Sequence, residues 1–377
     1  MHVSGKELKK NFSVALALLL TAILPALHLY SIQENPTFQI PVIDSMEYFS
    51  AAKKIAGGAL LETRLEHLSL LYTWFLASIF SVFGNELLVV KAGQILLNVG
   101  SAFFLYLAVL ELSSKKEAVV ALYIWAFYGP ILFFTCEILS IGFILFFYTL
   151  SIYMVTLARK QKSLVGWGRA GFVLGLSVLA RPDIVLFLGL LGLMLLFSFP
   201  GDKDGFKKRA GIIFFFSFFA SLPLFLASSI TYSSSGEFRF LPADSGLNLF
   251  IGNNPESAKS IGARPGLYWD SLSEHPGKAG GDGSSRERNS FYHEAVGAFL
   301  LEHFSAFTRN LAFKTMTLVN GYELPSTLDI YSFRKYSVVL TILTWTTAWF
   351  SFPWGVLMPL GIVGIWIDRG NKEYRWL

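Results

Sequence analysis

Long apolar runs alternate with short polar segments along most of the chain. A helix needs about 20 apolar residues to cross the hydrocarbon core of a bilayer. Eight runs reach or approach that length, at residues 12–30, 87–110, 118–135, 138–157, 165–180, 183–199, 210–229 and 350–367. Two further stretches, 68–83 and 337–349, fit either a span or a helix in the membrane interface. The pattern predicts an all-α, polytopic integral membrane protein.

The positions of the basic residues decide whether the stretch 68–83 crosses the membrane. Fifteen of the 31 Lys and Arg fall in loops 1–11, 111–117, 158–164, 200–209 and 368–377, against 7 acidic residues. Segment 31–86 holds only 3 basic residues and 6 acidic ones. Cytoplasmic loops are rich in Lys and Arg, and the basic loops share one side only if 68–83 does not cross. We therefore expect about eight spans in an inner (plasma) membrane, with both termini cytoplasmic.

This topology organises the chain into a core, an outer region and a tail. The core is 1–229, with an outward-facing loop at 31–86; the basic start and apolar run of its first 30 residues indicate a retained span. Residues 230–349 form a second outward-facing region, expected to be turns and loops rather than a second packed domain, with helix over 286–320. Residues 350–377 hold the last span and a cytoplasmic tail.

Composition removes several function classes. The net charge of +5 follows from membrane sidedness, so no nucleic-acid partner is predicted. The single cysteine, Cys136, excludes internal disulfides and multi-thiolate metal clusters. His275, His293 and His303 lack metal-ligand spacing. A divalent metal held by two carboxylates stays conceivable, but none is predicted, and no cofactor is expected.

Four ionisable residues gather at the predicted outer ends of the spans. Glu137 is the one charge between residues 118 and 158, in a short turn between two spans. Lys91 lies one turn inside a span, and Arg181 and Asp183 flank a helix-breaking proline. Such residues either mark span ends or form a functional site, and their gathering on one side favours a site.

The first outer loop adds two carboxylates. In "DSMEYFSAAKKIA", Asp44 fits a helix N-cap and Glu47 the third residue of a capping box. The alternative is a catalytic carboxylate at a helix N-terminus facing the membrane surface. One residue can fill both roles.

The order of motifs resembles the GT-C membrane glycosyltransferases of the family-39/83 type, which use polyprenyl-phosphate sugars. Protein O-mannosyltransferases and lipid A aminoarabinose transferase are of this type. The motifs, which run from about residue 12 to the C-terminus, are "DSMEYFSAAKKIAGG", "LLYTWFLASIFSVFGNELLVVKAGQ", "ALYIWAFYGPILFFTCEIL", "GLSVLARPD", "GLNLFIGNNPES", "GLYWDSL" and "YELPSTLDIYSFRKYS". The resemblance implies a GT-C fold.

The resemblance also implies roles for individual residues. Asp44 corresponds to the catalytic base and Glu137 to a second catalytic-site residue, while Arg181 and Lys91 correspond to ligands of the donor phosphate. Supporting residues would be Glu47, Tyr48, Asp183, Asn253 and Asn254. The chain departs from the family's pattern in "LLYTW", which lacks two common prolines, in Lys91, where an arginine is common, and in its short C-terminal part.

The implied activity is inverting transfer of a sugar from a polyprenyl-phosphate donor to a hydroxyl of a lipid, glycan or protein acceptor at the outer face of the membrane. A single displacement needs a carboxylate base for the acceptor and cations for the departing phosphate. Two alternatives remain: an inactive relative that binds lipid-linked sugars, and a transporter or flippase. The nearly uncharged interiors of the spans disfavour a transport route.

Overall fold

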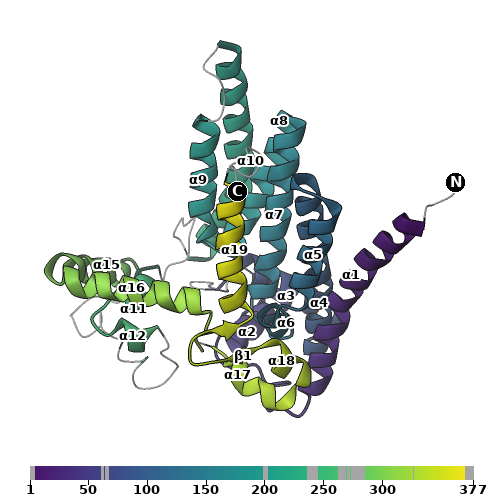
Figure 1. Ribbon diagram of the computed structural model, residues 1–377. Coiled ribbons are helices and arrows are strands. Elements are labelled where there is room, and N and C mark those ends of the chain that lie inside the picture. The colour runs from purple at the N-terminus through teal and green to yellow at the C-terminus, as the bar shows by residue number, and fades with distance from the viewer. Residues whose placement is uncertain are drawn as a thin grey trace. The chain divides into compact units, whose positions relative to one another are not determined.

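The computed structural model describes residues 5–60, 63, 68–197, 203–235, 245–261, 269, 272, 285–325 and 327–369. The chain divides into two compact units (Figure 1). Unit 1 comprises Met1–Pro41 and Ser45–Leu241, and unit 2 comprises Val42–Asp44 and Pro242–Leu377. We describe each unit by itself.

Unit 1 is a bundle of apolar helices. Its described helices are α1 (Gly5–Ser31), α2 (Asp44–Ala56), α3 (Leu70–Phe83), α4 (Leu87–Leu112), α5 (Lys115–Ala126), α6 (Gly129–Thr135), α7 (Ile141–Gln161), α8 (Leu164–Ala180), α9 (Ile184–Phe197) and α10 (Lys203–Ser235). Within the described residues, α1, α4, α7 and α10 are long and apolar enough to cross a membrane, and the pair α5–α6 makes up to five. The helices α3, α8, α9 and α19 (Trp354–Asp368, in unit 2) are apolar but shorter. The predicted all-helical, polytopic membrane fold is confirmed, and the number of eight spans stays a prediction.

The run predicted as one span at 118–135 is broken. Helices α5 and α6 meet at an angle of 58°. Tyr128, just before α6, has extended backbone, and Pro130 lies in the first turn of α6. A proline fits there because the first N–H groups of a helix have no intrahelical partner, whereas inside a continuous helix it would remove a hydrogen bond. The break therefore falls where the sequence tolerates it.

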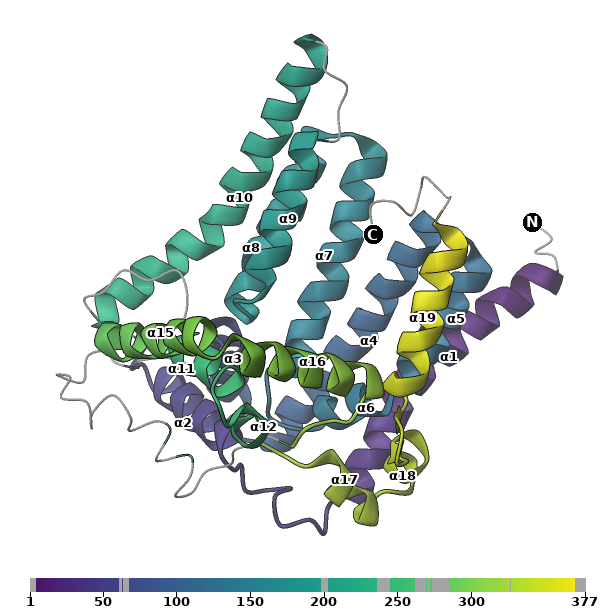
Figure 2. The same cartoon turned by 60° about the vertical axis from the view of Figure 1, so that its left-hand side comes forward.

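The helices of unit 1 pack in the order α10, α8, α7, α4, with α1 and α5 beyond α4 (Figure 2). Helix α8 approaches α10 most closely through a Gly-x-x-x-Gly pair. A Cβ added at Gly171 would lie 2.2 Å from the carbonyl oxygen of Phe216, and one at Gly175 would lie 2.3 Å from that of Ala220. Small residues allow helix backbones to touch, and in lipid this contact replaces the hydrophobic driving force.

The described residues between α1 and α4 form two helices. Helix α2 forms over the segment expected to be helical, and α3 forms over the ambiguous stretch 68–83, where Ser69 caps it by accepting a hydrogen bond from the Tyr72 N–H. Helix α3 packs on α8 and α4. Tyr48, Tyr72 and Phe143 belong to one buried apolar cluster, so this cluster joins the loop helices to α7.

Unit 2 is also mostly helical. Its described elements are α11 (Ser245–Gly252), α12 (Ser257–Ser260), α15 (Ser285–Glu302), α16 (Phe304–Asn320), α17 (Ile330–Phe333), a 3-10 turn (Arg334–Tyr336), α18 (Val338–Leu343), β1 (Trp345–Thr346), β2 (Ser351–Phe352) and α19. The strands form an antiparallel hairpin that pairs Trp345 with Phe352. The helix expected over 286–320 is present, divided at His303. Where turns and loops were expected around it, α11 and α12 add to a compact unit.

Candidate active site

A short turn between α6 and α7 positions Glu137, as the sequence predicted. The side chain of Gln94, two turns into α4, fixes this turn because its Nε2 donates to the carbonyl oxygens of Thr135, at 2.8 Å, and of Glu137, at 2.7 Å. Cys136 adds a contact from Sγ to the carbonyl oxygen of Pro25, at 3.3 Å. Two helices, α4 and α1, thus hold the backbone around Glu137 in place.

The Glu137 side chain is buried. It is only 5% exposed, and within the described part of the chain no hydrogen bond or ion pair reaches its carboxylate. Burial disfavours the charged form and raises the pKa of Glu137 to about 7, although the nearby cation Lys91 opposes this shift. A carboxyl group with such a pKa changes its charge near neutral pH, as is common for acid–base groups in active sites.

Lys91 lies one turn into α4, as predicted, and is 2% exposed. Its ammonium donates to the carbonyl oxygen of Phe38, at 3.0 Å, and lies 4.3 Å from the centre of the Phe38 ring. The carbonyl oxygen and the ring face both stabilise a buried cation. Lys91 therefore adds positive potential beside Glu137, with its ammonium already hydrogen-bonded.

Two tyrosines, one from α2 and one from α3, complete this cluster. The Tyr72 hydroxyl donates to Gln94 Oε1 at 2.6 Å, and its ring packs edge-on against Tyr48 at 4.9 Å between centroids. The Tyr48 hydroxyl accepts from the Ser69 N–H at 3.0 Å and donates to Ser140 Oγ at 3.4 Å. Burial raises the pKa of Tyr72 well above its ordinary value, so this hydroxyl remains a donor.

Arg181 and Asp183 lie in the turn between α8 and α9. Arg181 Nε donates to Asp183 Oδ2 at 2.8 Å, and the Tyr148 hydroxyl donates to Asp183 Oδ1 at 3.1 Å. The Ser69 hydroxyl donates to the carbonyl oxygen of Leu179 at 3.5 Å, which links this turn to the tyrosine pair. The Arg181 side chain is half-exposed, and its terminal nitrogens form no hydrogen bond or ion pair within the described residues. These nitrogens are therefore accessible to an anionic ligand.

Asp44, which belongs to unit 2, is the first residue of α2, not a residue before the helix. Its Oδ2 accepts a hydrogen bond from the Thr327 hydroxyl at 2.6 Å, and the residue is exposed. Glu47 is exposed on the next turn of the same helix. Asp44 is therefore open to solvent and held by one hydroxyl, which suits a group that exchanges protons.

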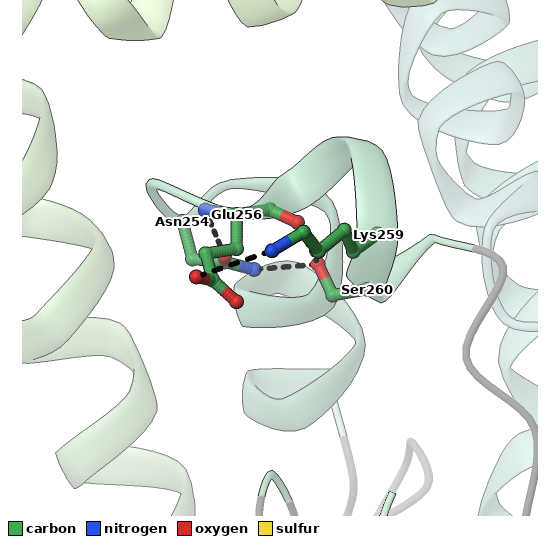
Figure 3. Close-up of polar contacts among 4 residues, drawn as sticks. All are labelled: Asn254, Glu256, Lys259 and Ser260. Atoms are coloured by element: carbon green, nitrogen blue, oxygen red, sulfur yellow. Dashed lines mark hydrogen bonds and ion pairs between the residues drawn. The ribbon is translucent and has the colours of Figure 1, made fainter. Parts of the chain in front are cut away.

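The two asparagines expected to be supporting residues, Asn253 and Asn254, both lie in unit 2 but have different hydrogen-bond partners. Asn254 is buried, and its side chain binds the backbone N–H of Glu256, at 2.7 Å, and the Ser260 hydroxyl, at 2.8 Å (Figure 3). Asn254 thus shapes the turn that opens α12. Asn253 Oδ1 instead accepts from Lys314 Nζ, at 2.8 Å. Asn253 Nδ2 donates to the carbonyl oxygen of Leu249, at 2.8 Å, and Asn253 is the less buried residue of the pair.

Three residues of the cluster were not predicted from the sequence: Gln94, Tyr72 and Tyr148. Gln94 belongs to a polar row on α4 with Lys91, Asn98 and Ser101, all buried. The spacing of three and four residues is that of one helix face and was a readable signal. The roles of the tyrosines depend on which helices meet, and no local pattern encodes that. No group of three or more His, Cys, Asp or Glu that could hold a metal ion occurs among the residues the structure describes.

Comparison with protein families gives one match. Residues 67–227 match the sequence model of the dolichyl-phosphate-mannose-protein mannosyltransferase family. The matched segment contains Lys91, Glu137 and Arg181 and excludes Asp44. Comparison with the curated proteins and with the solved structures gave no match. The family match supports the predicted resemblance to the GT-C membrane glycosyltransferases, and the apolar helices of unit 1 are those expected of a multi-pass membrane protein.

Proposed function

We propose that the protein transfers a sugar from a polyprenyl-phosphate donor to an acceptor hydroxyl, with inversion, at the outer face of a plasma membrane whose cytoplasmic side holds both termini. The observation that carries the proposal is the cluster in the family-matched segment. There hydrogen bonds through Ser69, Tyr72 and Gln94 join the end of α8, next to the accessible guanidinium of Arg181, to the backbone of the turn that holds Glu137. The Glu137 carboxyl group is buried in that turn.

The donor's phosphate is assigned to Arg181. One nitrogen of its guanidinium binds Asp183, which orients the planar group, and the others remain for a phosphate. Arginine binds phosphate oxygens through parallel N–H donors, and such charge-assisted bonds are among the strongest hydrogen bonds in proteins. Lys91, whose ammonium is buried on Phe38, contributes positive potential rather than direct contact. In this scheme these cations, and no metal, stabilise the leaving phosphate.

Asp44 is assigned the role of base. The acceptor oxygen forms a bond to the anomeric carbon as its proton passes to the Asp44 carboxylate. The bond from that carbon to the phosphate oxygen breaks, and its electrons leave with the polyprenyl phosphate. One displacement inverts the anomeric configuration, as in inverting glycoside hydrolysis. The exposure of Asp44 and the resemblance of its motif support this role.

Glu137 is assigned a positioning role through the charge of the cluster. Its carboxyl group makes no hydrogen bond within the described residues and titrates near neutral pH beside Lys91. Its protonation therefore sets how positive the cluster is when a phosphate approaches. The acceptor is a lipid, glycan or protein hydroxyl, and Asn253 in unit 2 is the residue we assign to its recognition, because its side chain is less buried than that of Asn254.

The test is transfer by purified protein in lipid vesicles, with radiolabelled polyprenyl-phosphate hexoses and crude membrane acceptors. Asp44→Asn should lower the rate by about 100- to 10,000-fold, the usual contribution of a general base, while donor binding persists. Glu34→Gln, an exposed acid of the same loop, is the matched control. Transfer unaffected by Asp44→Asn would overturn the role of Asp44. Binding without transfer by the wild type would instead indicate an inactive relative.

A second pair of variants tests the phosphate site. Arg181→Gln should weaken donor binding by roughly 10- to 100-fold, because a hydrogen bond to a charged group contributes about 1.5–3 kcal/mol. Arg169→Gln removes an exposed arginine nearer the other end of α8 and should leave binding unchanged. Equal effects of the two substitutions would show that only overall charge matters. The anomeric configuration of the product, read by NMR, decides between inversion and retention.

A further inference from the structure

Helix α16 exposes an apolar row along its whole length. Phe304, Leu311 and Leu318 are each between 54% and 64% exposed. Residues seven apart lie on the same side of a helix, so the three form one row. None of the residues of α16 is buried, and exposed Val319 lies next to the row. A row of this kind needs a partner, because water is a poor solvent for it.

Helix α19, in the same unit, indicates that the row on α16 faces lipid. Its exposed side chains are apolar on every side: Leu360, Ile362, Val363, Ile365, Trp366 and Ile367. A helix that is apolar all round belongs in a protein core or in lipid, and these side chains are not in a core. The chain around the start of α19 carries exposed aromatic residues, Tyr322, Trp349 and Trp354, with Trp349 at 86%. Tryptophan and tyrosine concentrate at the level of lipid headgroups, so α19 enters the membrane at its first turn.

The two helices are joined at a corner that fixes their relative direction. Trp354 Nε1 donates to the carbonyl oxygen of Leu318, at 2.8 Å. Gly321 ends α16 with a φ of +74°, and a Cβ there would lie 2.5 Å from the Gly355 nitrogen. A Cβ on Gly355 would lie 2.5 Å from the carbonyl oxygen of Asn320. Both backbones therefore touch, and α16 runs crosswise to α19 from this corner (Figures 1 and 2).

We propose that α16 is an interfacial helix, which lies along the membrane surface with the row Phe304–Leu311–Leu318 in the lipid. The aromatic residues at the start of α19 set the depth of α16 in the membrane, and the contact between Gly321 and Gly355 sets its direction. The row on α16 continues the apolar surface of α19. An amphipathic helix in this position buries its apolar side to the boundary between headgroups and acyl chains. A second copy of the chain or another protein could also cover such a row, but neither would account for the headgroup-level aromatic residues at its end.

The proposal gives the rest of unit 2 a fixed height above the membrane. On another side of α16, Asn310 Nδ2 donates to the carbonyl oxygen of Asn254, at 3.0 Å, and Lys314 Nζ donates to Asn253 Oδ1. The Asn253–Asn254 turn is thus carried by α16. A helix anchored in the interface holds this turn beside the headgroups, where a lipid-linked substrate is presented.

The test measures the depth of single labelled positions in full-length protein in phosphatidylcholine–phosphatidylglycerol vesicles. Cysteines at Leu311→Cys and Leu318→Cys are labelled with bimane and quenched by lipids brominated high in the acyl chain. Arg309→Cys is the control, since two residues correspond to about 200° around a helix. The unsubstituted protein corrects for labelling of buried Cys136.

Loss of bimane fluorescence in brominated lipid at 311 and 318, with little loss at 309, is the expected result. Equal losses at the three positions would overturn the proposal. So would the absence of quenching at 311 together with efficient crosslinking between the 311 cysteines of two copies, which would assign the row to a contact between chains.

Discussion

Replacement of Glu137 with Gln should remove a pH-dependent part of the protein's stability. Burial raises the pKa of Glu137 from an ordinary 4.5 to about 7. One pKa unit corresponds to ~1.4 kcal/mol, so the fully ionised carboxylate costs the folded state ~3 kcal/mol relative to the unfolded state. Native proteins are typically stable by only about 5–15 kcal/mol, so this cost is measurable.

The sign follows from the two pKa values. Below pH 4.5 the group is protonated in both states and the folded protein has its full stability. Between pH 4.5 and about 7 the unfolded chain loses the proton while the folded chain keeps it, so the free energy of unfolding falls as the pH rises. Above that range both states are ionised and the loss is complete.

The assay is SDS-induced unfolding in mixed micelles, followed by circular dichroism, between about pH 5 and about pH 8. The wild type should lose ~3 kcal/mol over this range, and Glu137→Gln should lose much less. Glu34→Gln, which changes an exposed acid, should behave like the wild type. Lys91→Met removes the cation that lowers the pKa of Glu137 and should move the fall to higher pH. A Glu137→Gln profile parallel to that of the wild type would refute the reasoning.

Three further predictions concern packing and the phosphate site. Gly171→Ala should destabilise the protein by about 1–3 kcal/mol, because its Cβ would overlap a backbone carbonyl of α10. Gly189→Ala, with nothing within 4 Å of the added Cβ, should be neutral or slightly stabilising. The unfolding midpoints of the two variants check both expectations. Tyr72→Phe should cost about 1–3 kcal/mol in the same assay, since the buried Gln94 oxygen loses its donor. Arg181→Lys should keep the charge but weaken donor binding about tenfold, because lysine lacks the planar fork; unchanged binding would show that the site needs only a charge.

The sequence was sufficient to predict the helical fold and the local position of its charged residues. Hydropathy runs predict helices directly, because each span must satisfy its own backbone in lipid. Glu137 and Arg181 occur in turns because a charge or a proline interrupts a run at those points. The same logic placed Lys91 one turn inside its helix. Hydropathy runs and turn positions depend only on the local sequence of one segment, so they can be predicted from a single sequence.

Burial and partners depend on how segments meet, and there the sequence was less informative. Lys91 was expected to be a phosphate ligand, but its ammonium is covered by Phe38, a residue more than fifty positions away. Asn254 and Asn253 are adjacent and alike in sequence, yet the side chain of Asn254 shapes a turn while that of Asn253 binds Lys314. The break between α5 and α6 was visible only as a proline, which a span also tolerates.

The proposed function gives separate roles to Lys91 and Arg181, which the resemblance had both assigned to the donor phosphate. In that proposal the buried Lys91 and Glu137 act on the donor through the electrostatic potential, because the low dielectric of their surroundings leaves their field little screened. The accessible guanidinium of Arg181 is proposed to act through direct hydrogen bonds to the phosphate. Substitution of Glu137 should therefore change how donor binding varies with pH, and the Arg181→Lys substitution should change affinity at every pH alike. If both substitutions instead changed the pH dependence, the buried pair and Arg181 would form one electrostatic unit, and the assignment of separate roles would fail.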